Sequence, residues 1–129
     1  MIEHMAAREY VVTEEMTAQA VRSGSLRVLA TPVIAAWMEE ASTEAIHSLL
    51  PEGITTVGTR LELDHVSPTP VGARVRVDSR LVKTEGRKYT FEVTAEDENG
   101  ICAKGTHIRY AVKIESFLKK AYGTKEETV

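Results

Sequence analysis

One stretch of the chain, LATPVIAAWMEEAS at residues 29–42, constrains the fold more than any other. Its large apolar residues recur at helical spacing, and alanines occupy positions between them, a pattern typical of a helix covered on most of its sides. Thr31 can cap the start of this helix, and Pro32 suits its first turn. The sequence therefore predicts a long apolar helix over residues 31–50, around which the rest of the chain must fold.

Alternating apolar and polar residues dominate the chain after this helix, which is typical of antiparallel strands with one buried face. The predicted long strands are residues 57–67, 73–82, 88–96 and 101–114. Asn99-Gly100, between the last two, is a strong hairpin signal. One face of such a sheet must cover the helix, so the sequence predicts an α+β fold with segregated elements.

Shorter elements flank this core. We expect a short strand at residues 10–12, a short helix at 13–25, a final helix at 115–122, and irregular ends at 1–8 and 122–129. A chain of 129 residues is long enough for one hydrophobic core without disulfides or metals. The expected organisation is therefore a single domain over residues 1–129.

Strict alternation in the first long strand predicts which of its side chains face the helix. The inward-facing set is Val57, Thr59, Leu61, Leu63 and His65. Gly58 then lies on the opposite face. An edge strand left open would invite pairing with another chain, so we expect a homodimer and leave a tetramer open.

The composition excludes several classes of function. The net charge of −3 provides no general attraction to nucleic acid. No segment reaches the ~20 consecutive apolar residues of a membrane span, and the N-terminus lacks the pattern of a signal peptide. Cys102 is the one cysteine, which excludes an intrachain disulfide and fits a reducing compartment. These features lead us to expect a cytoplasmic protein. No glycine-rich phosphate loop or dinucleotide fingerprint is present, and we expect no cofactor.

Three segments occur in an order and spacing that resemble hotdog-fold proteins. They are ATPVIAAWMEEA in the helix, VGTRLELDHVSPTPVG in the first long strand and GTHIRYAV in the last. Within that superfamily the chain is most similar to the fluoroacetyl-CoA thioesterase-like branch, over residues 10–120. The resemblance implies a sheet that wraps a central helix, a dimer, and hydrolysis of a small acyl-CoA thioester.

The resemblance also implies which residues form the site. It implies a triad-like set of Thr31, Glu39 and His65. It further implies substrate-binding roles for Gly58 and for Arg109, near the acyl-CoA. The fluoroacetate-selective member of the branch carries phenylalanines in a lid before the helix, whereas the segment AVRSGSLRVL has none. Fluoroacetyl selectivity is therefore not carried over to this chain.

Glu39 stands out from the residues alone, because a carboxylate on an apolar helix is costly unless it has a partner or a function. It lies ~12 Å of helical rise beyond Thr31, so the two side chains cannot meet within one chain. They can meet if a second copy packs its helix in the opposite direction, which a two-fold dimer does twice. An imidazole paired to this carboxylate, that of His65, could take a proton from Thr31 or from water.

Each of these residues also has a structural alternative, which the sequence leaves open. Thr31 can be a simple cap, Glu39 can reach solvent, and His65 can be a satisfied core histidine. Arg109 can be a surface charge on the last strand. A metal cluster of Glu39, His65 and His107 lacks any short ligand spacing, so no metal is expected. A non-catalytic protein that binds acyl-CoA is the alternative function.

Coenzyme A carries phosphates, and basic side chains on the outer face or turns of two neighbouring strands could contact them. This set comprises Arg74, Arg76, Arg80, Lys83, Arg87 and Lys88. The alternative is a solvated charged face without a ligand.

Overall fold

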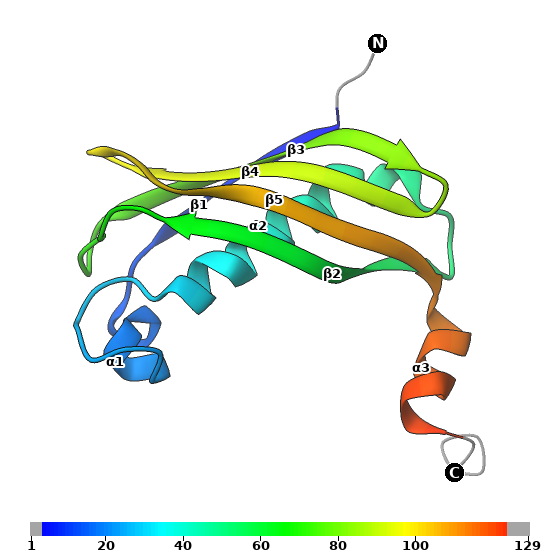
Figure 1. The fold of residues 1–129 in the computed structure, drawn as a ribbon, viewed down its shortest axis with the longest axis horizontal. Coiled ribbons are helices and arrows are strands. Elements are labelled where there is room, and N and C mark those ends of the chain that lie inside the picture. Colours follow the sequence, from blue (N-terminus) through cyan, green and yellow to red (C-terminus); the bar gives the residue numbers. More distant parts are fainter. Residues whose placement is uncertain (1–3, 124–129) are drawn as a thin grey trace.

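The computed structural model describes residues 4–123, in which a five-stranded antiparallel sheet curves around one long helix (Figure 1). The strands are β1 (Met5–Val11), β2 (Ile54–His65), β3 (Arg74–Glu85), β4 (Lys88–Asp97) and β5 (Gly100–Lys113). Their order in the sheet is β1-β3-β4-β5-β2, and every neighbouring pair is antiparallel. The predicted α+β class, with the sheet wrapped around the central helix, is confirmed.

The helices differ greatly in length. The central helix is α2 (Thr31–Ile46), which continues into the 3-10 turn η2 (His47–Leu49); the others are η1 (Glu14–Met16), α1 (Ala18–Val21) and α3 (Ile114–Tyr122). The predicted helix at 13–25 is broken, because Arg22 adopts a left-handed conformation with φ 66° and ends α1. Between residues 4 and 123, no helix is long and apolar enough to cross a membrane.

The N-terminal strand is longer than the predicted strand at residues 10–12. β1 begins at Met5, within the segment 1–8 that we expected to be irregular, and it pairs with β3 along its whole length. At the other end, α3 reaches Tyr122. Residues 1–3 and 124–129 lie outside the described part of the chain, and with them most of the irregular ends that we expected.

The face of α2 toward the sheet supplies much of the core. Its buried residues are Ile34, Trp37, Met38, Ala41, Ser42, Ala45 and Ile46. Burial of each large apolar side chain contributes ~1.5–3 kcal/mol to stability. The prediction of a helix covered on most of its sides is wrong, because the opposite face is open: Ala36 is exposed, and the side chain of Glu39 is 47% exposed.

Side chains of strand β1 bind two of the three acidic residues of α2. The guanidinium of Arg8 contacts the carboxylate of Glu44 at 2.8 Å, and the hydroxyl of Tyr10 donates to Glu40. Partial burial and the neighbouring Glu40 raise the pKa of Tyr10 to about 12. Glu40 and Glu44 are therefore structural, whereas Glu39 turns away from this network.

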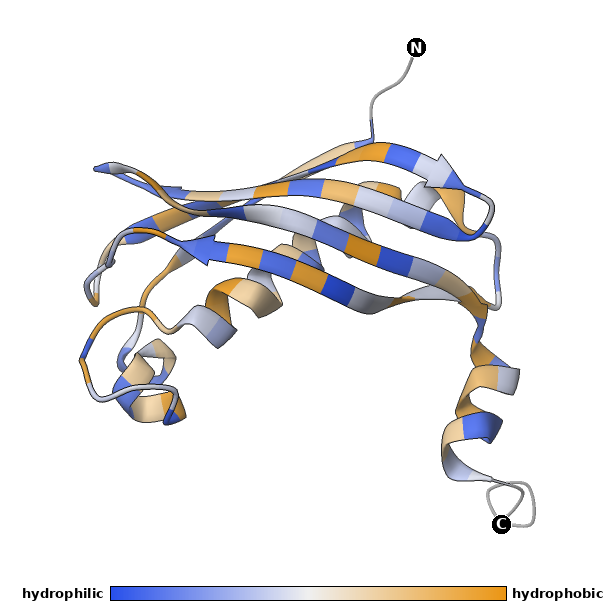
Figure 2. Ribbon diagram, in the orientation of Figure 1, coloured by the Kyte–Doolittle hydropathy of each residue, from blue (hydrophilic) through white to orange (hydrophobic). Residues whose placement is uncertain are grey.

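A bulge in β2 changes which of its residues face the helix. Polar and apolar residues alternate along β2 (Figure 2), but its register with β5 shifts between Gly58 and Arg60. Such an extra residue reverses the alternation on one side of the bulge. Leu61, Leu63 and His65 face inward as predicted, whereas the inward placement of Val57 and Thr59 is wrong. Thr56, which is buried, and Gly58 take the inward positions instead.

Gly105 on β5 sits where the backbone of β2 comes unusually close. A methyl group at this position would lie 2.0 Å from the carbonyl oxygen of Glu62. We expect Gly105→Ala to lower the free energy of unfolding by about 2–3 kcal/mol, because two paired strands must separate to admit it. Chemical denaturation measures the loss, with Thr106→Ala, at an exposed position beside it, as the control. Equal stability of the two variants would contradict the contact.

Candidate active site

The end of β2 brings a histidine against the start of α2. The Oγ1 atom of Thr31 lies 2.7 Å from Nδ1 of His65. Thr31 was predicted to cap the helix, but the cap is Ala30, and Thr31 is the first helical residue. Its hydroxyl is therefore free for the imidazole, beside backbone N–H groups that have no partner within the helix.

His65 has one engaged and one free ring nitrogen. Its Nε2 atom is buried and has no hydrogen-bond partner in the described residues. A small cavity of about 240 Å³, lined by Val28 and by residues 65–68, lies beside the ring. Burial lowers the pKa of His65 below its ordinary value, and the backbone of Ser67 partly offsets this. The imidazole is therefore neutral near pH 7 and can act as a base.

A second polar cluster centres on Arg109, which is 7% exposed. Its Nε donates to the hydroxyl of Thr56 at 2.8 Å and its Nη2 to the carbonyl of the same residue at 2.9 Å. Its Nη1 donates to Glu39 at 3.1 Å and faces Nε2 of His107 at 3.2 Å. The guanidinium, held by three residues, fixes the carboxylate of Glu39 on the open face of α2.

His107 supports Arg109 from the same face of β5. Because a guanidinium only donates, Nε2 of His107 must be the acceptor, and Nδ1–H then donates to the carbonyl of Arg60 at 2.8 Å. Burial is the main cause that lowers the pKa of His107, and the charge of Arg109 adds to it. This histidine is therefore neutral and structural.

Gly58 leaves the space that Glu39 occupies. A methyl group there would lie 2.5 Å from Oε1 of Glu39 and 3.1 Å from Nη1 of Arg109. The predicted outward position of Gly58 is wrong, and the bulge in β2 is the reason. Its missing side chain makes room for the carboxylate–guanidinium contact.

The five residues implied by the resemblance form two separate groups on one chain. The structure brings Thr31 to His65 and brings Glu39 to Gly58 and Arg109, but within residues 4–123 no hydrogen bond or ion pair joins the groups. The position of Glu39 eight residues beyond Thr31, ~12 Å along the helix, keeps the groups apart. Residues 4–123 contain no cluster of three or more His, Cys, Asp or Glu side chains that could hold a metal ion.

Sequence reasoning missed Thr56 as a partner of this site. It precedes the predicted start of the strand at residue 57, so no alternation placed it. The signal for His107 was present, because His107 and Arg109 are two residues apart and share one face of a strand.

Comparison with known proteins shows to which family the chain belongs. A family model described as fluoroacetyl-CoA-specific thioesterase (FlK) matches residues 12–115. The fluoroacetyl-CoA thioesterase of Streptantibioticus cattleyicolor is 33% identical over 93 residues, 72% of this chain and 67% of that protein.

Two solved structures are similar over nearly the whole chain. A structure of FlK, the fluoroacetyl-CoA thioesterase, superposes with a TM-score of 0.88 at 26% identity and covers 95% of both chains. A thioesterase superfamily member from Thermus thermophilus, TTHA0967, has a TM-score of 0.88 at 30% identity over 98% of this chain and 94% of its own. The chain therefore belongs to the fluoroacetyl-CoA-specific thioesterase family and is a thioester hydrolase with the hotdog fold.

Proposed function

We propose that two copies of this protein form a homodimer that hydrolyses small acyl-CoA thioesters at two equivalent sites. Each site combines Thr31 and His65 of one copy with Glu39, Gly58 and Arg109 of the other. The observation that carries this proposal is the separation of the two groups on one chain, each incomplete by itself. A two-fold axis across α2 would bring the start of one helix to the middle of the other, twice.

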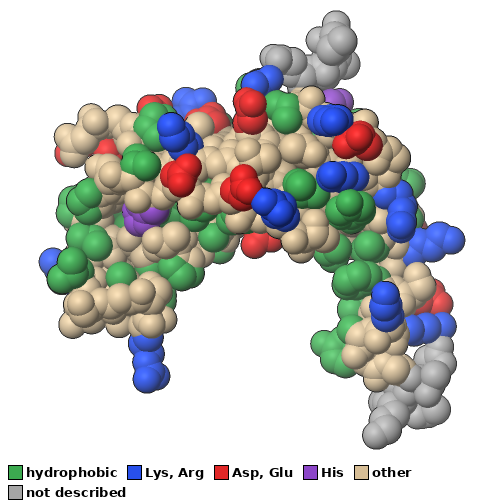
Figure 3. All heavy atoms as spheres, in the orientation of Figure 1, with side chains coloured by type: hydrophobic (Ala, Val, Ile, Leu, Met, Phe, Trp, Pro, Cys, Tyr) green, Lys and Arg blue, Asp and Glu red, His purple; other side chains and the backbone are tan. Residues whose placement is uncertain are grey.

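Two features of the surface favour such a dimer. β2 is an edge strand, so one side of its backbone is free to pair with a second β2. The space-filling view shows a hollow beneath the sheet between the segment of α1 and that of α3 (Figure 3). The open face of α2, with the exposed residues Pro32 and Ala36, can receive a second helix there. Whether two dimers join into a tetramer stays open.

The chemistry follows from the neutral imidazole of His65. It removes the proton from the attacking oxygen, that oxygen bonds to the thioester carbon, and the C–S bond then breaks. The imidazolium returns its proton to the leaving thiolate. N–H groups at the start of α2 stabilise the charge that develops on the carbonyl oxygen. The carboxylate of Glu39 from the other copy, which Arg109 holds in place, orients or activates the base.

The attacking oxygen has two possible sources. Thr31 can attack and form an acyl ester that water then hydrolyses, or it can hold the substrate while His65 activates water directly. We expect a cytoplasmic enzyme in either case, since its one cysteine needs no oxidising compartment.

The experiment is a panel of acyl-CoA substrates, varied in chain length and polarity, with release of free thiol as the readout. We expect multiple turnovers with small acyl groups and a loss of kcat of about 10²-fold or more in Thr31→Ala, Glu39→Gln and His65→Ala. Glu40→Gln is the matched control, because this neighbouring carboxylate bonds to Tyr10. Binding of acyl-CoA without turnover would indicate a non-catalytic protein. Activity that survives in Thr31→Ala but not in the other two would select direct attack by water.

The lowered pKa of His65 predicts an acid limit for catalysis. kcat/KM should stay constant above pH 6.5, the ordinary histidine value, and fall once the pH passes below the lowered pKa. The free energy of unfolding should also fall as the pH drops below 6.5, because His65 takes up its proton at a higher pH in the unfolded chain than in the folded one. Fluorescence of the single, buried Trp37 measures folding over the same pH range. Activity that rises as the pH falls below 6.5, while Trp37 fluorescence still reports a folded protein, would contradict a base role.

A further inference from the structure

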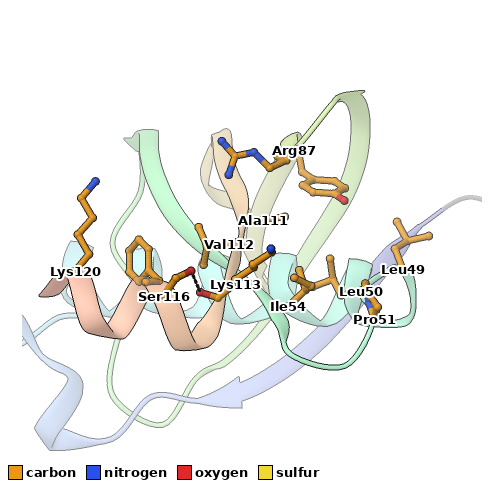
Figure 4. Close-up of a pocket in the computed structure, with 12 residues that line it drawn as sticks. Leu49, Leu50, Pro51, Ile54, Arg87, Ala111, Val112, Lys113, Ser116 and Lys120 are labelled. Atoms are coloured by element: carbon orange, nitrogen blue, oxygen red, sulfur yellow. Dashed lines mark hydrogen bonds between the residues drawn. The ribbon is translucent and has the colours of Figure 1, made fainter. Parts of the chain in front are cut away.

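A second hollow lies beyond the C-terminal end of α2. It is a cavity of about 520 Å³ between α3 and the link from η2 to β2 (Figure 4). Figure 4 shows Lys120 on α3 at one side and Leu50 with Pro51 at the other. Its floor is apolar and partly aromatic, with Ile54, Tyr89, Ala111 and Phe117 among the lining residues.

Three cations surround this hollow. They are Arg87 from the β3–β4 turn, Lys113 at the end of β5 and Lys120 of α3. All three are exposed, and none has an ion-pair partner among residues 4–123. A cluster of unpaired positive charge over an apolar floor is suited to a ligand that carries both phosphate and apolar surface.

Most of the basic residues that the sequence suggested as phosphate contacts differ from these three cations, because they have ion-pair partners. Four of the six, all on β3, have acidic partners: Arg74 with Glu9, Arg76 with Asp78, Arg80 with Glu92, and Lys83 with Glu85. These four lie on exposed strand positions as a solvated, largely compensated face. Of the six, Arg87 alone lines the hollow.

The hollow is lined from the same face of β5 as the Glu39–Arg109 cluster, one inward position further along the strand. Ala111 follows Arg109 by two residues on the same face of β5, a rise of ~7 Å. Tyr89 of β4 pairs directly with Arg109 across the sheet. A long ligand whose reacting end lies near Glu39 can therefore extend over Tyr89 and Ala111 toward the three cations.

We propose that this hollow, the nucleotide groove, binds the phosphorylated adenosine end of coenzyme A. The proposal rests on the proposed function, because it assigns the far end of the same substrate. Thioester and phosphates lie at opposite ends of coenzyme A, as the carboxylate cluster and the three cations do here. The adenine ring provides an aromatic surface for Tyr89 and Phe117, and the phosphates meet Arg87, Lys113 and Lys120. A concave groove favours this small ligand over the convex surface of an acidic carrier protein.

The experiment compares two substrates with the same acyl group, one on coenzyme A and one on pantetheine, which lacks the nucleotide. Arg87→Ala, Lys113→Ala and Lys120→Ala should each raise KM for the acyl-CoA about fivefold, with a larger rise when combined, because each removes one charge–phosphate contact. kcat should be unchanged, and kcat/KM for the acyl-pantetheine should change less than about twofold. Arg74→Ala removes one positive charge outside the groove and is the matched control.

Equal effects on both substrates, or no effect on either, would overturn the groove. So would a KM effect that appears with an acyl carrier protein but not with acyl-CoA. Calorimetry with adenosine 3′,5′-bisphosphate separates this inference from the proposed function. If the wild-type protein hydrolysed no acyl-CoA, the proposed function would fail, and binding of the bisphosphate, lost in the triple variant, would still support the groove.

Discussion

Mixing His65→Ala protein with Glu39→Gln protein should restore a thioesterase activity that neither variant has alone. Each variant by itself should lose about 10²–10⁴-fold in kcat, because every site in the proposed dimer would lack either the base or the carboxylate. In a heterodimer one site carries both defects, and the other has His65 from one copy and Glu39 from its partner. A random mixture should therefore recover about a quarter of the wild-type rate, since half of its dimers are mixed and each has one complete site.

The measurement uses co-expression with two different tags, so that the heterodimer can be isolated and assayed. Where Thr31→Ala is inactive by itself, the control is a mixture of His65→Ala with Thr31→Ala. In the proposed dimer both residues of a site come from the same copy, so each site of that heterodimer lacks one of them and no activity should return. Light scattering checks the oligomeric state. Full activity in a monomer, or recovery in the control mixture, would show that the site is not shared between copies.

The separation of Thr31 from Glu39 was predictable from the sequence, because spacing along a helix is fixed. Thr31 and Glu39 are eight residues apart in any α-helix, which no packing detail can change. The strands were predictable for a similar reason, since period-two alternation holds over most of β3, β4 and β5, where Val75, Phe91 and His107 are all buried. It is interrupted only locally, by register shifts after Leu81 and after Ala95. The helical spacing and the strand alternation were therefore sufficient to predict the fold.

Local departures from regularity were not predictable. The bulge at residues 58–60 shifts β2 by one position, and nothing in its alternating residues announces where the extra residue falls. The helix cap is Ala30 and not Thr31, and the hydroxyl of Thr31 bonds instead to His65, a contact between distant parts of the chain that the local sequence does not reveal. The exposure of Glu39 was not predictable from periodicity either, because the apolar residues of α2 do not reveal which of its faces packs on the sheet.

Gly58→Ala should lower kcat about 10²-fold while the protein stays folded. The added methyl group would lie 2.5 Å from Oε1 of Glu39, the movable end of a flexible side chain, so the carboxylate shifts and the backbone does not. A displacement of about 1 Å at a reacting group costs that much in rate. Steady-state kinetics measures the loss, and thermal unfolding should show a change below about 1 kcal/mol. Thr59→Ala, at the exposed neighbouring position, is the control.

A double-variant cycle distinguishes a positioning role of Gly58 from direct contact with the substrate. If Gly58 acts through Glu39, then Gly58→Ala should cost nothing more in a protein that already carries Glu39→Ala, because the displaced group is gone. If Gly58 instead contacts the substrate, the two losses should multiply. Multiplied losses would contradict the positioning role, and the glycine would then be a substrate-binding residue, as the family resemblance implies. If Gly58→Ala lowers kcat only when Glu39 is present, the effect on the rate lies at the carboxylate. The added methyl group comes within 3.1 Å of Arg109 in both backgrounds, so that approach cannot explain the difference.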